Sequence, residues 1–218
     1  TNTEARKQAV RTLGKIRDTN TLGFIYKGIE DEAWSVRQAS IKALKGMIDK
    51  SSIPFLETML QNENEDYRYA ATILLGQLGS NVEVPLLINA LGDSNEKVRR
   101  AAVGALGLIG DERAINPLID FLFQEGYSSV SAYEVSYALK MVLGNRRNVS
   151  DAVNTILGNK TTYIHEKVVT DLFLSFNPSE VVPLLICHLE SDEIEIVNGV
   201  KKILKRIGLP AVPYLIDI

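Results

Sequence analysis

The sequence is poor in the residues that build covalent and metal-bound sites. It contains one cysteine, Cys187, and two histidines among 218 residues. A single cysteine cannot form a disulfide within the chain, and a metal site needs several ligands. We therefore expect no disulfide, no metal and no cofactor, and the scarcity of cysteine favours a reducing, cytoplasmic location.

Long apolar runs are also missing. No apolar stretch reaches the roughly 18 residues that span a bilayer, so we expect no membrane partner. The strict apolar–polar alternation typical of β-strands is absent as well. The composition is otherwise ordinary, with 45% hydrophobic and 23% charged residues. These absences predict an all-α fold.

The sequence does contain a repeat. One helix-sized pattern occurs seven times with leucine always at the same position: Leu13, Leu44, Leu75, Leu106, Leu139, Leu172 and Leu204. The first four leucines are 31 residues apart, and the later gaps are 33, 33 and 32 residues. A fixed period in this range is typical of proteins in which each unit stacks on its neighbours. We predict a single array of about six and a half repeats over residues 1–218.

Each repeat contains two helices. In residues 98–110 the apolar side chains follow the i, i+3, i+4, i+7 spacing of an amphipathic helix, and Gly110 ends it. We call these longer segments the B helices and place them at residues 3–17, 35–48, 66–79, 97–110, 130–144, 163–177 and 195–208. Shorter A helices lie between them, and proline opens five of these: Pro54, Pro85, Pro117, Pro183 and Pro213. The expected fold is a right-handed α-solenoid of antiparallel helix pairs.

Residues 93–110, which read DSNEKVRRAAVGALGLIG, resemble the short HEAT repeat of the bilin-lyase type. The segment from Asp31 through Val36-Arg37 to Ala43-Leu44 is similar to the same repeat, and the resemblance covers the chain but weakens after residue 126. It implies that the B helices line the concave side of the solenoid. It also implies a structural role for arginines that bond across the turns between helices and form a ladder: Arg37, Arg68 and Arg99, each six residues after Asp31, Asn62 or Asp93.

The chain opens in a B helix and stops in an A helix. Neither end shows the polar cap that a repeat array needs for solubility. We expect a fragment of a longer solenoid, with self-association through the uncapped ends as the alternative.

A net charge of −3 hides a strong segregation of charge. The B segments hold 18 of the 24 lysines and arginines but only 6 of the 27 acidic residues. Their solvent-facing positions are basic at the two ends of the array and aromatic or apolar in the middle, which is typical of a protein-binding surface. Packing against adjacent helices is the alternative explanation for Tyr69, Ile73 and Tyr137. The predicted partner-binding residues are Lys7, Arg11, Lys42, Lys45, Tyr69, Ile73, Arg100, Tyr133, Tyr137, Lys140, Lys202 and Lys205.

We predict a non-catalytic scaffold that binds a protein or peptide, expected to be acidic, on the concave face of the B helices. The alternative is nucleic-acid binding through the same face, with cations on phosphates and tyrosines stacked on bases. The acidic pI of about 5.5 argues against that alternative.

An enzymatic function is the least favoured of the three interpretations. The resemblance to bilin lyases carries no catalytic residue into this chain. Deoxyhypusine hydroxylase is a HEAT-type enzyme that uses His-Glu pairs to hold two irons, and this chain has a single such pair, His165-Glu166. Cys187 and His188 are adjacent on a predicted helix, so their side chains point about 100° apart and make a poor nucleophile–base pair.

Overall fold

The computed structural model describes residues 2–124, 132–144, 149–158, 172–174 and 176–215, and every regular element in these ranges is helical. The all-α fold is therefore confirmed. The chain divides into two compact units, Thr1–Ile109 and Gly110–Ile218, which we call unit 1 and unit 2. Within the described ranges, no helix combines the length and apolarity that a bilayer crossing requires.

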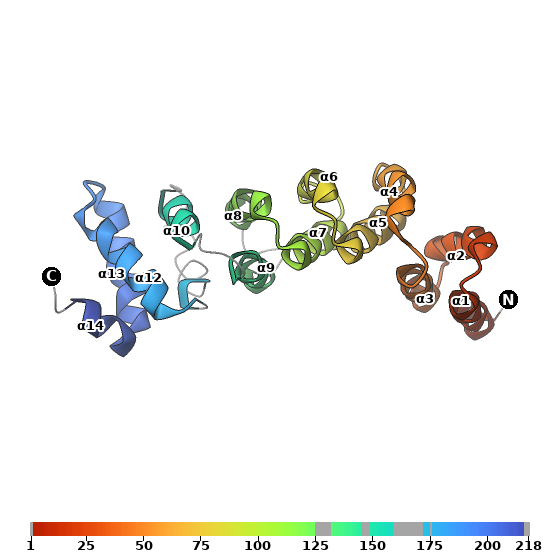
Figure 1. The fold of residues 1–218 in the computed structure, drawn as a ribbon, viewed down its shortest axis with the longest axis horizontal. Helices are drawn as coiled ribbons and strands as arrows, with labels where there is room; N and C mark the ends of the chain where they lie inside the picture. Colours follow the sequence, from red (N-terminus) through yellow and green to blue (C-terminus); the bar gives the residue numbers. More distant parts are fainter. Residues whose placement is uncertain (1, 125–131, 145–148, 159–171, 175, 216–218) are drawn as a thin grey trace. The chain divides into compact units, whose positions relative to one another are not determined.

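Unit 1 contains two layers of helices (Figure 1). Its B helices are α1 (Thr3–Ile16), α3 (Trp34–Lys45), α5 (Glu65–Leu78) and α7 (Glu96–Ile109). Its A helices are α2 (Leu22–Lys27), α4 (Ile53–Leu60) and α6 (Val84–Ala90). Each A helix packs on the B helix that follows it, and successive B helices pack on one another. The four B helices begin within one residue of their predicted starts.

Unit 2 continues the pattern with α8 (Ile115–Gln124), α9 (Ala132–Gly144), α10 (Val149–Gly158), α12 (Pro178–Cys187), α13 (Ile194–Ile207) and α14 (Val212–Leu215). Helix α8 packs on α9, and α12 packs on both α10 and α13. Most of the B helix predicted at residues 163–177 lies outside the described residues. Short 3-10 turns join the helices of both units: Thr19–Thr21, Gly28–Glu30, Lys50–Ser52, Asn81–Glu83, Glu112–Ala114, His188–Glu190 and Leu209–Ala211.

The recurring leucine forms the centre of the buried face of each B helix. It is fully buried or nearly so at six positions: Leu44, Leu75, Leu106, Leu139, Leu172 and Leu204. Leu13, on α1, is only half-buried. Burial of one apolar stripe per helix is the main source of stability in such a stack. Because the leucines lie in that stripe, the repeat register predicted from the sequence is confirmed.

Proline lies in the first turn of several A helices, and one of the five predicted positions is wrong. Four of the five predicted prolines lie in the first turn of a helix: Pro54, Pro85, Pro117 and Pro213. The prediction for Pro183 is wrong, because α12 begins at Pro178 and continues past Pro183. The Asn177 side chain accepts a hydrogen bond from the Ser179 N–H at 3.1 Å and caps the helix there. Pro183 therefore interrupts the backbone hydrogen bonding of α12 without ending it.

Two pairs of B helices approach closely at a glycine. A Cβ built on Gly14 of α1 would lie 2.6 Å from the Cβ of Ala43 on α3, and one built on Gly76 of α5 would lie 2.6 Å from the Cβ of Ala105 on α7. Ordinary carbon–carbon contact is about 3.5–4 Å, so only glycine permits these approaches. Lys45 occupies the equivalent position on α3, and α3 packs less extensively on α5. Tight and looser B-helix interfaces therefore alternate in unit 1.

The arginines that the resemblance singles out do bond across the turns. Arg37 Nη1 donates to the backbone carbonyls of Asp31 at 2.7 Å and Glu32 at 3.1 Å. Arg68 and Arg99 make the equivalent pairs of hydrogen bonds in their own repeats. Their predicted structural role is confirmed.

The ladder has a member that the sequence analysis did not include. Arg6, which lies 31 residues before Arg37, donates from Nε to Oδ2 of Asp31 at 2.7 Å and from Nη2 to Oδ1 at 2.9 Å. Arg68 holds Asp93 in the same bidentate way, at 2.7 and 3.0 Å. Two-pronged arginine–carboxylate pairs are strong and geometrically specific. They tie each of these B helices to the turn one repeat further on.

These pairs also shift the titration of the carboxylates. The hydrogen bond from Arg6 holds the pKa of Asp31 below its ordinary value. Burial would raise the pKa of Asp93, but hydrogen bonds from Arg68 and from the Asn95 N–H outweigh it, so that pKa is also lowered. Both carboxylates are therefore held in the charged form by the ladder.

Candidate functional site

The predicted partner-binding residues all lie on B helices, and none of them is buried. In unit 1 they are Lys7, Arg11, Lys42, Lys45, Tyr69, Ile73 and Arg100, which we call the unit 1 B face. In unit 2 they are Tyr133, Tyr137, Lys140, Lys202 and Lys205, which we call the unit 2 B face. Their participation in binding stays a prediction.

The cations of the unit 1 B face differ in how far they are neutralised. Lys7 Nζ donates to Glu4 at 3.2 Å, and Arg100 lies 3.9 Å from Glu96 one helical turn away. Arg11, Lys42 and Lys45 are exposed and make no salt bridge to any residue that the structure describes. Exposed pairs such as the first two contribute little to stability. The three exposed cations are the ones most available to an external anion.

Besides Lys7, two residues of this face are half-buried. Tyr69 and Ile73 lie on α5, and Tyr69 lines a small hollow of about 40 Å³ between α3 and α5 together with Trp34. Packing against the neighbouring helix, the alternative explanation for these two side chains, therefore accounts for part of their surface. Tyr69 still contributes to an accessible recess at the looser interface.

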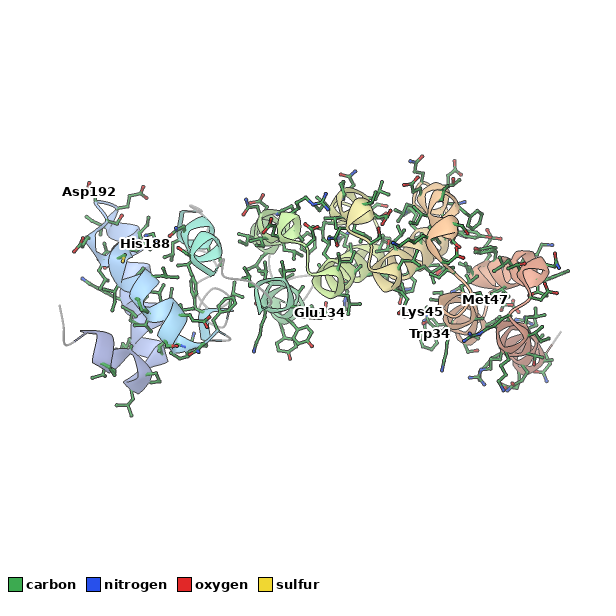
Figure 2. The ribbon with its side chains drawn as sticks, in the orientation of Figure 1. Trp34, Lys45, Met47, Glu134, His188 and Asp192 are labelled. Carbon is green, nitrogen blue, oxygen red and sulfur yellow. The ribbon has the colours of Figure 1, made fainter. Side chains whose placement is uncertain are left out.

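Trp34 is the residue at this recess that sequence reasoning missed. Trp34 lies at the start of α3 (Figure 2), and its side chain is 63% exposed. A tryptophan left in solvent is uncommon because its large apolar surface is normally buried. Trp34 is the first residue of α3, whereas the solvent-facing positions were projected from the periodic pattern of the middle of each helix. It was therefore not among the predicted surface residues.

The unit 2 B face carries a pair of exposed tyrosines. Tyr133 and Tyr137, one turn apart on α9, are 77% and 55% exposed. Their rings are stacked with centroids 6.4 Å apart and planes at 21°. Exposed Lys140 follows on the same helix. Tyr137 does not tuck against an adjacent helix, so the packing alternative does not apply to it.

Sequence reasoning also missed Arg17, which directly follows α1. Its φ of 56° is the only positive value at a non-glycine residue of the described chain. The equivalent positions after α5, α7 and α13 are occupied by Gly79, Gly110 and Gly208, all with positive φ. The available signal was an arginine standing where the other repeats have the glycine that ends a B helix.

Two of the groups considered for chemistry, Cys187 and His188, lie in the described part of the chain. Cys187 is exposed, and His188 Nε2 lies 2.9 Å from Oδ1 of Asn154, which joins α12 to α10. His165 and Glu166 lie outside the described residues. Within the described part of the chain, no three histidine, cysteine or acidic side chains gather in a way that could hold a metal ion.

The displaced carboxylate pKa values have structural causes. Hydrogen bonds from Gln8 and Lys7 lower the pKa of Glu4, and those from the side chain and N–H of Ser51 lower the pKa of Asp49. Asp31 and Asp93 belong to the arginine ladder. Catalytic carboxylic acids usually face a cleft, and their own pKa values are often raised. These four instead secure turns and helix ends.

A sequence model of HEAT repeats matches residues 1–76 and 55–140 of the chain. Together these matches cover more than half of its length. They include α1 through α8, most of α9, and the arginine ladder. No curated protein sequence matches the chain.

Solved structures with low sequence identity are similar to the chain. The complex of CpcE and CpcF of phycocyanin lyase from Nostoc sp. PCC7120 is 18% identical, with 95% of this chain and 90% of that chain covered and a TM-score of 0.48. An engineered protein is 17% identical, with coverages of 96% and 93% and a TM-score of 0.47. Kap95p, in a structure with RanGDP, is 14% identical over 93% of this chain and 30% of that chain, with a TM-score of 0.51. At this level of identity the likeness concerns the fold.

Proposed function

Because the chain belongs to the HEAT-repeat family, we propose that it is a non-catalytic scaffold that binds a protein or peptide through its B faces. The observation that carries the proposal is that the two sides of the described B helices differ. The leucine-bearing side is buried, while the opposite side presents lysine, arginine and tyrosine to solvent. The structure of Kap95p with RanGDP is an example of a similar fold that binds a protein.

The charge of the unit 1 B face favours an acidic partner. Arg11, Lys42 and Lys45 are exposed and have no acidic neighbour at salt-bridge distance among the described residues. Complementary charge mainly speeds association and selects the partner, and it is weakened by salt. We expect the association rate to fall as salt concentration rises.

The stacked tyrosines of the unit 2 B face are suited to hold a partner in place. Tyrosine combines a large apolar ring with a hydroxyl group, and it is enriched among the residues that dominate binding energy. Tyr133 and Tyr137 already stack on each other. A bound segment therefore meets a preordered surface and restricts few additional rotamers.

The non-catalytic part of the proposal rests on where the ionisable groups are used. The carboxylates with shifted pKa values in the described residues bond to arginines, to a helix-capping turn or to side chains of their own helix. Exposed Cys187 as a free thiol is compatible with a reducing compartment, and we propose a cytoplasmic location on that basis.

The experiment is a pull-down from extract of the source cells with matched charge reversals on the two layers of unit 1. The test variant is Lys42→Glu with Lys45→Glu, on the B helix α3. The control is Lys27→Glu with Lys50→Glu, which makes the same charge change at exposed lysines of the A layer. We expect proteins that wild type and the control both retain to be lost only from the test variant. Loss from the control alone, or from neither variant, contradicts the proposal.

Purified partner then allows rate measurements. Tyr133→Ala with Tyr137→Ala should speed dissociation, whereas the lysine reversals should slow association. Nucleic-acid binding makes a different forecast, since its affinity falls steeply between about 50 and 200 mM salt. Micromolar binding of mixed-sequence oligonucleotides at the lower salt that collapses at the higher salt overturns the protein-scaffold assignment.

A further inference from the structure

The strongest unassigned feature is a basic cleft between α1 and α3 of unit 1. The cleft has a volume of about 460 Å³. Its lining contains four cationic side chains and no aspartate or glutamate: Arg11, Lys15, Arg17 and Lys42. Gly14 and Ala43, the closely packed pair of the two helices, also line it.

The four cations have no acidic partner at salt-bridge distance among the described residues. None of their side chains makes a hydrogen bond or salt bridge with a residue that the structure describes. Glu4, the acidic side chain of α1, accepts hydrogen bonds from Lys7 and Gln8, and it attracts Arg11 only from beyond salt-bridge distance. Like charges gathered around one cleft repel each other and create a positive potential that attracts anions.

The fold itself does not require these charges. Helices α5 and α7 form a second tight pair, with Gly76 against Ala105, placed 62 residues further along the chain. The four positions that correspond to the cations are uncharged there: Ile73, Gln77, Gly79 and Gly104. The same helix packing is thus built with and without the cationic lining, so the charges of the first pair need another explanation.

Arg17 supplies an independent observation. Its left-handed backbone conformation disfavours an L side chain by about 1 kcal/mol or more, and Gly79 takes that conformation at the end of α5. Its guanidinium lies over Gly46 of α3, with Nη2 3.6 Å from the point where a Cβ would stand. A strained residue kept where glycine fits better is a feature that clusters at binding sites.

We propose that this cleft binds a phosphate group on a phosphorylated serine or threonine of the partner protein. The inference rests on the proposed scaffold function and names a chemical feature of the partner. A phosphoryl group carries nearly two negative charges, and its oxygens accept the paired N–H groups of arginine. A single carboxylate would leave most of the positive charge of the cleft uncompensated.

The confinement of the charge favours one phosphate over a nucleic-acid backbone. A strand that follows the B helices would meet cations at the repeat spacing, because its phosphates recur regularly. The equivalent surface on α5 and α7 offers Ile73, Gln77 and exposed Leu108 instead. An isolated cationic cleft fits a localised charge on a folded or extended protein segment.

The first test compares two peptides on the full chain. One is a short, fluorescently labelled peptide of alanine, glycine and one phosphoserine, and the other has serine at that position. We expect the phosphopeptide to bind at least about tenfold more tightly, which corresponds to about 1.4 kcal/mol. Titration with O-phosphoserine should also shift the amide NMR signals of Gly14 and Gly46. Equal affinity of the two peptides, or no shift at these glycines, overturns the proposal.

The decisive variant is Arg17→Gly, because it separates binding from folding. Glycine is the residue that the backbone conformation prefers, so the variant should unfold at the same or a higher urea concentration than wild type. Its affinity for the phosphopeptide should nevertheless fall about tenfold, by the loss of a charge-assisted hydrogen bond. Lys50→Gln, which removes an exposed charge that neither lines the cleft nor belongs to the unit 1 B face, should change that affinity much less. Unchanged phosphopeptide binding by Arg17→Gly contradicts the assignment.

The outcomes distinguish this proposal from the scaffold function. If Arg17→Gly leaves capture of the partner intact while the double tyrosine variant impairs it, the phosphate site is refuted and the scaffold stands. If the phosphopeptide binds as expected but the B-face variants all retain the partner, the scaffold assignment fails. Stronger binding of mixed-sequence oligonucleotides than of the phosphopeptide, lost in Arg17→Gly, assigns the cleft to nucleic acid instead.

Discussion

Two glycine-to-alanine substitutions in unit 1 should change stability in opposite directions. Gly76 of α5 is buried against α7, and a Cβ at that position would lie 2.6 Å from the Cβ and 2.8 Å from the Cα of Ala105. Gly104 of α7 is exposed, and a Cβ there would have no atom of another residue within 4 Å. Both positions lie inside helices, where alanine is intrinsically preferred by about 1 kcal/mol.

The balance of packing and propensity sets the expected magnitudes. At position 104 only the propensity acts, so Gly104→Ala should raise the free energy of unfolding by roughly 0.5–1 kcal/mol. At position 76 the backbone Cα of Ala105 cannot rotate away, so α5 and α7 must separate by about 1 Å to restore ordinary contact. Overpacking of this kind costs about 1–3 kcal/mol and can cost more. We expect Gly76→Ala to be destabilising by about 2 kcal/mol after the gain in helix propensity.

Urea unfolding followed by far-UV circular dichroism measures both effects. The double variant Gly76→Ala with Ala105→Gly is the control for the contact, because it moves the methyl group to the other helix. It should recover part of the lost stability, less the cost of a new glycine in α7. A stabilising effect of Gly76→Ala, or equal effects at positions 76 and 104, would refute the close approach of α5 and α7.

Two further predictions concern the core and the arginine ladder. Leu106→Ala should lower the free energy of unfolding by about 2–5 kcal/mol, because Leu106 is fully buried. Leu13→Ala should lower it by less, because Leu13 is only half-buried. A loss under about 1 kcal/mol for Leu106→Ala, measured by urea unfolding, would contradict the repeat register. The pKa values of Asp31 and Asp93 are lower in the folded protein than their ordinary value of 3.8, so the charged carboxylates stabilise the fold. Their full contribution is present above about pH 3.8 and is lost as the pH falls through the lower pKa values of the folded state. Arg68→Gln should therefore flatten the dependence of the unfolding midpoint between about pH 5 and 2, and an unchanged slope would show that the pair does not contribute.

The repeat could be predicted from the sequence because it is local, and the resemblance to HEAT repeats implied the bonds of Arg37, Arg68 and Arg99 to their own turns. An amphipathic helix shows its buried side through a period of 3.6 residues, so one leucine per repeat located the core of each B helix. Arg37 reaches carbonyls only five and six residues before it, a distance that its own repeat fixes. The same locality put most of the predicted lysines and tyrosines on exposed positions, whereas the neighbouring helix leaves Tyr69 only half-exposed.

Local reasoning failed where two influences competed within one segment. Pro183 carries the signal of a helix start, but the Asn177 cap and Pro178 begin α12 earlier, and the remaining backbone hydrogen bonds carry the helix through. Trp34 looks like a core residue by type, yet its place at the first turn of α3 leaves it in solvent. In both cases the position of the residue in its helix had more influence on the structure than the general preference of that residue type.

The spacing of helices was decided by the tertiary structure alone. The period of 31 residues is the same for the tight pair α1–α3 and the looser pair α3–α5, so it carries no information about how closely two helices approach. That distance depends on which side chain stands between the backbones, glycine at positions 14 and 76 and lysine at position 45. Only this packing gathers Arg11, Lys15 and Arg17 with Lys42 of the neighbouring helix around one cleft. Sequence determined the identity and outward direction of these charges, whereas the contact between separate helices determined that they share a site.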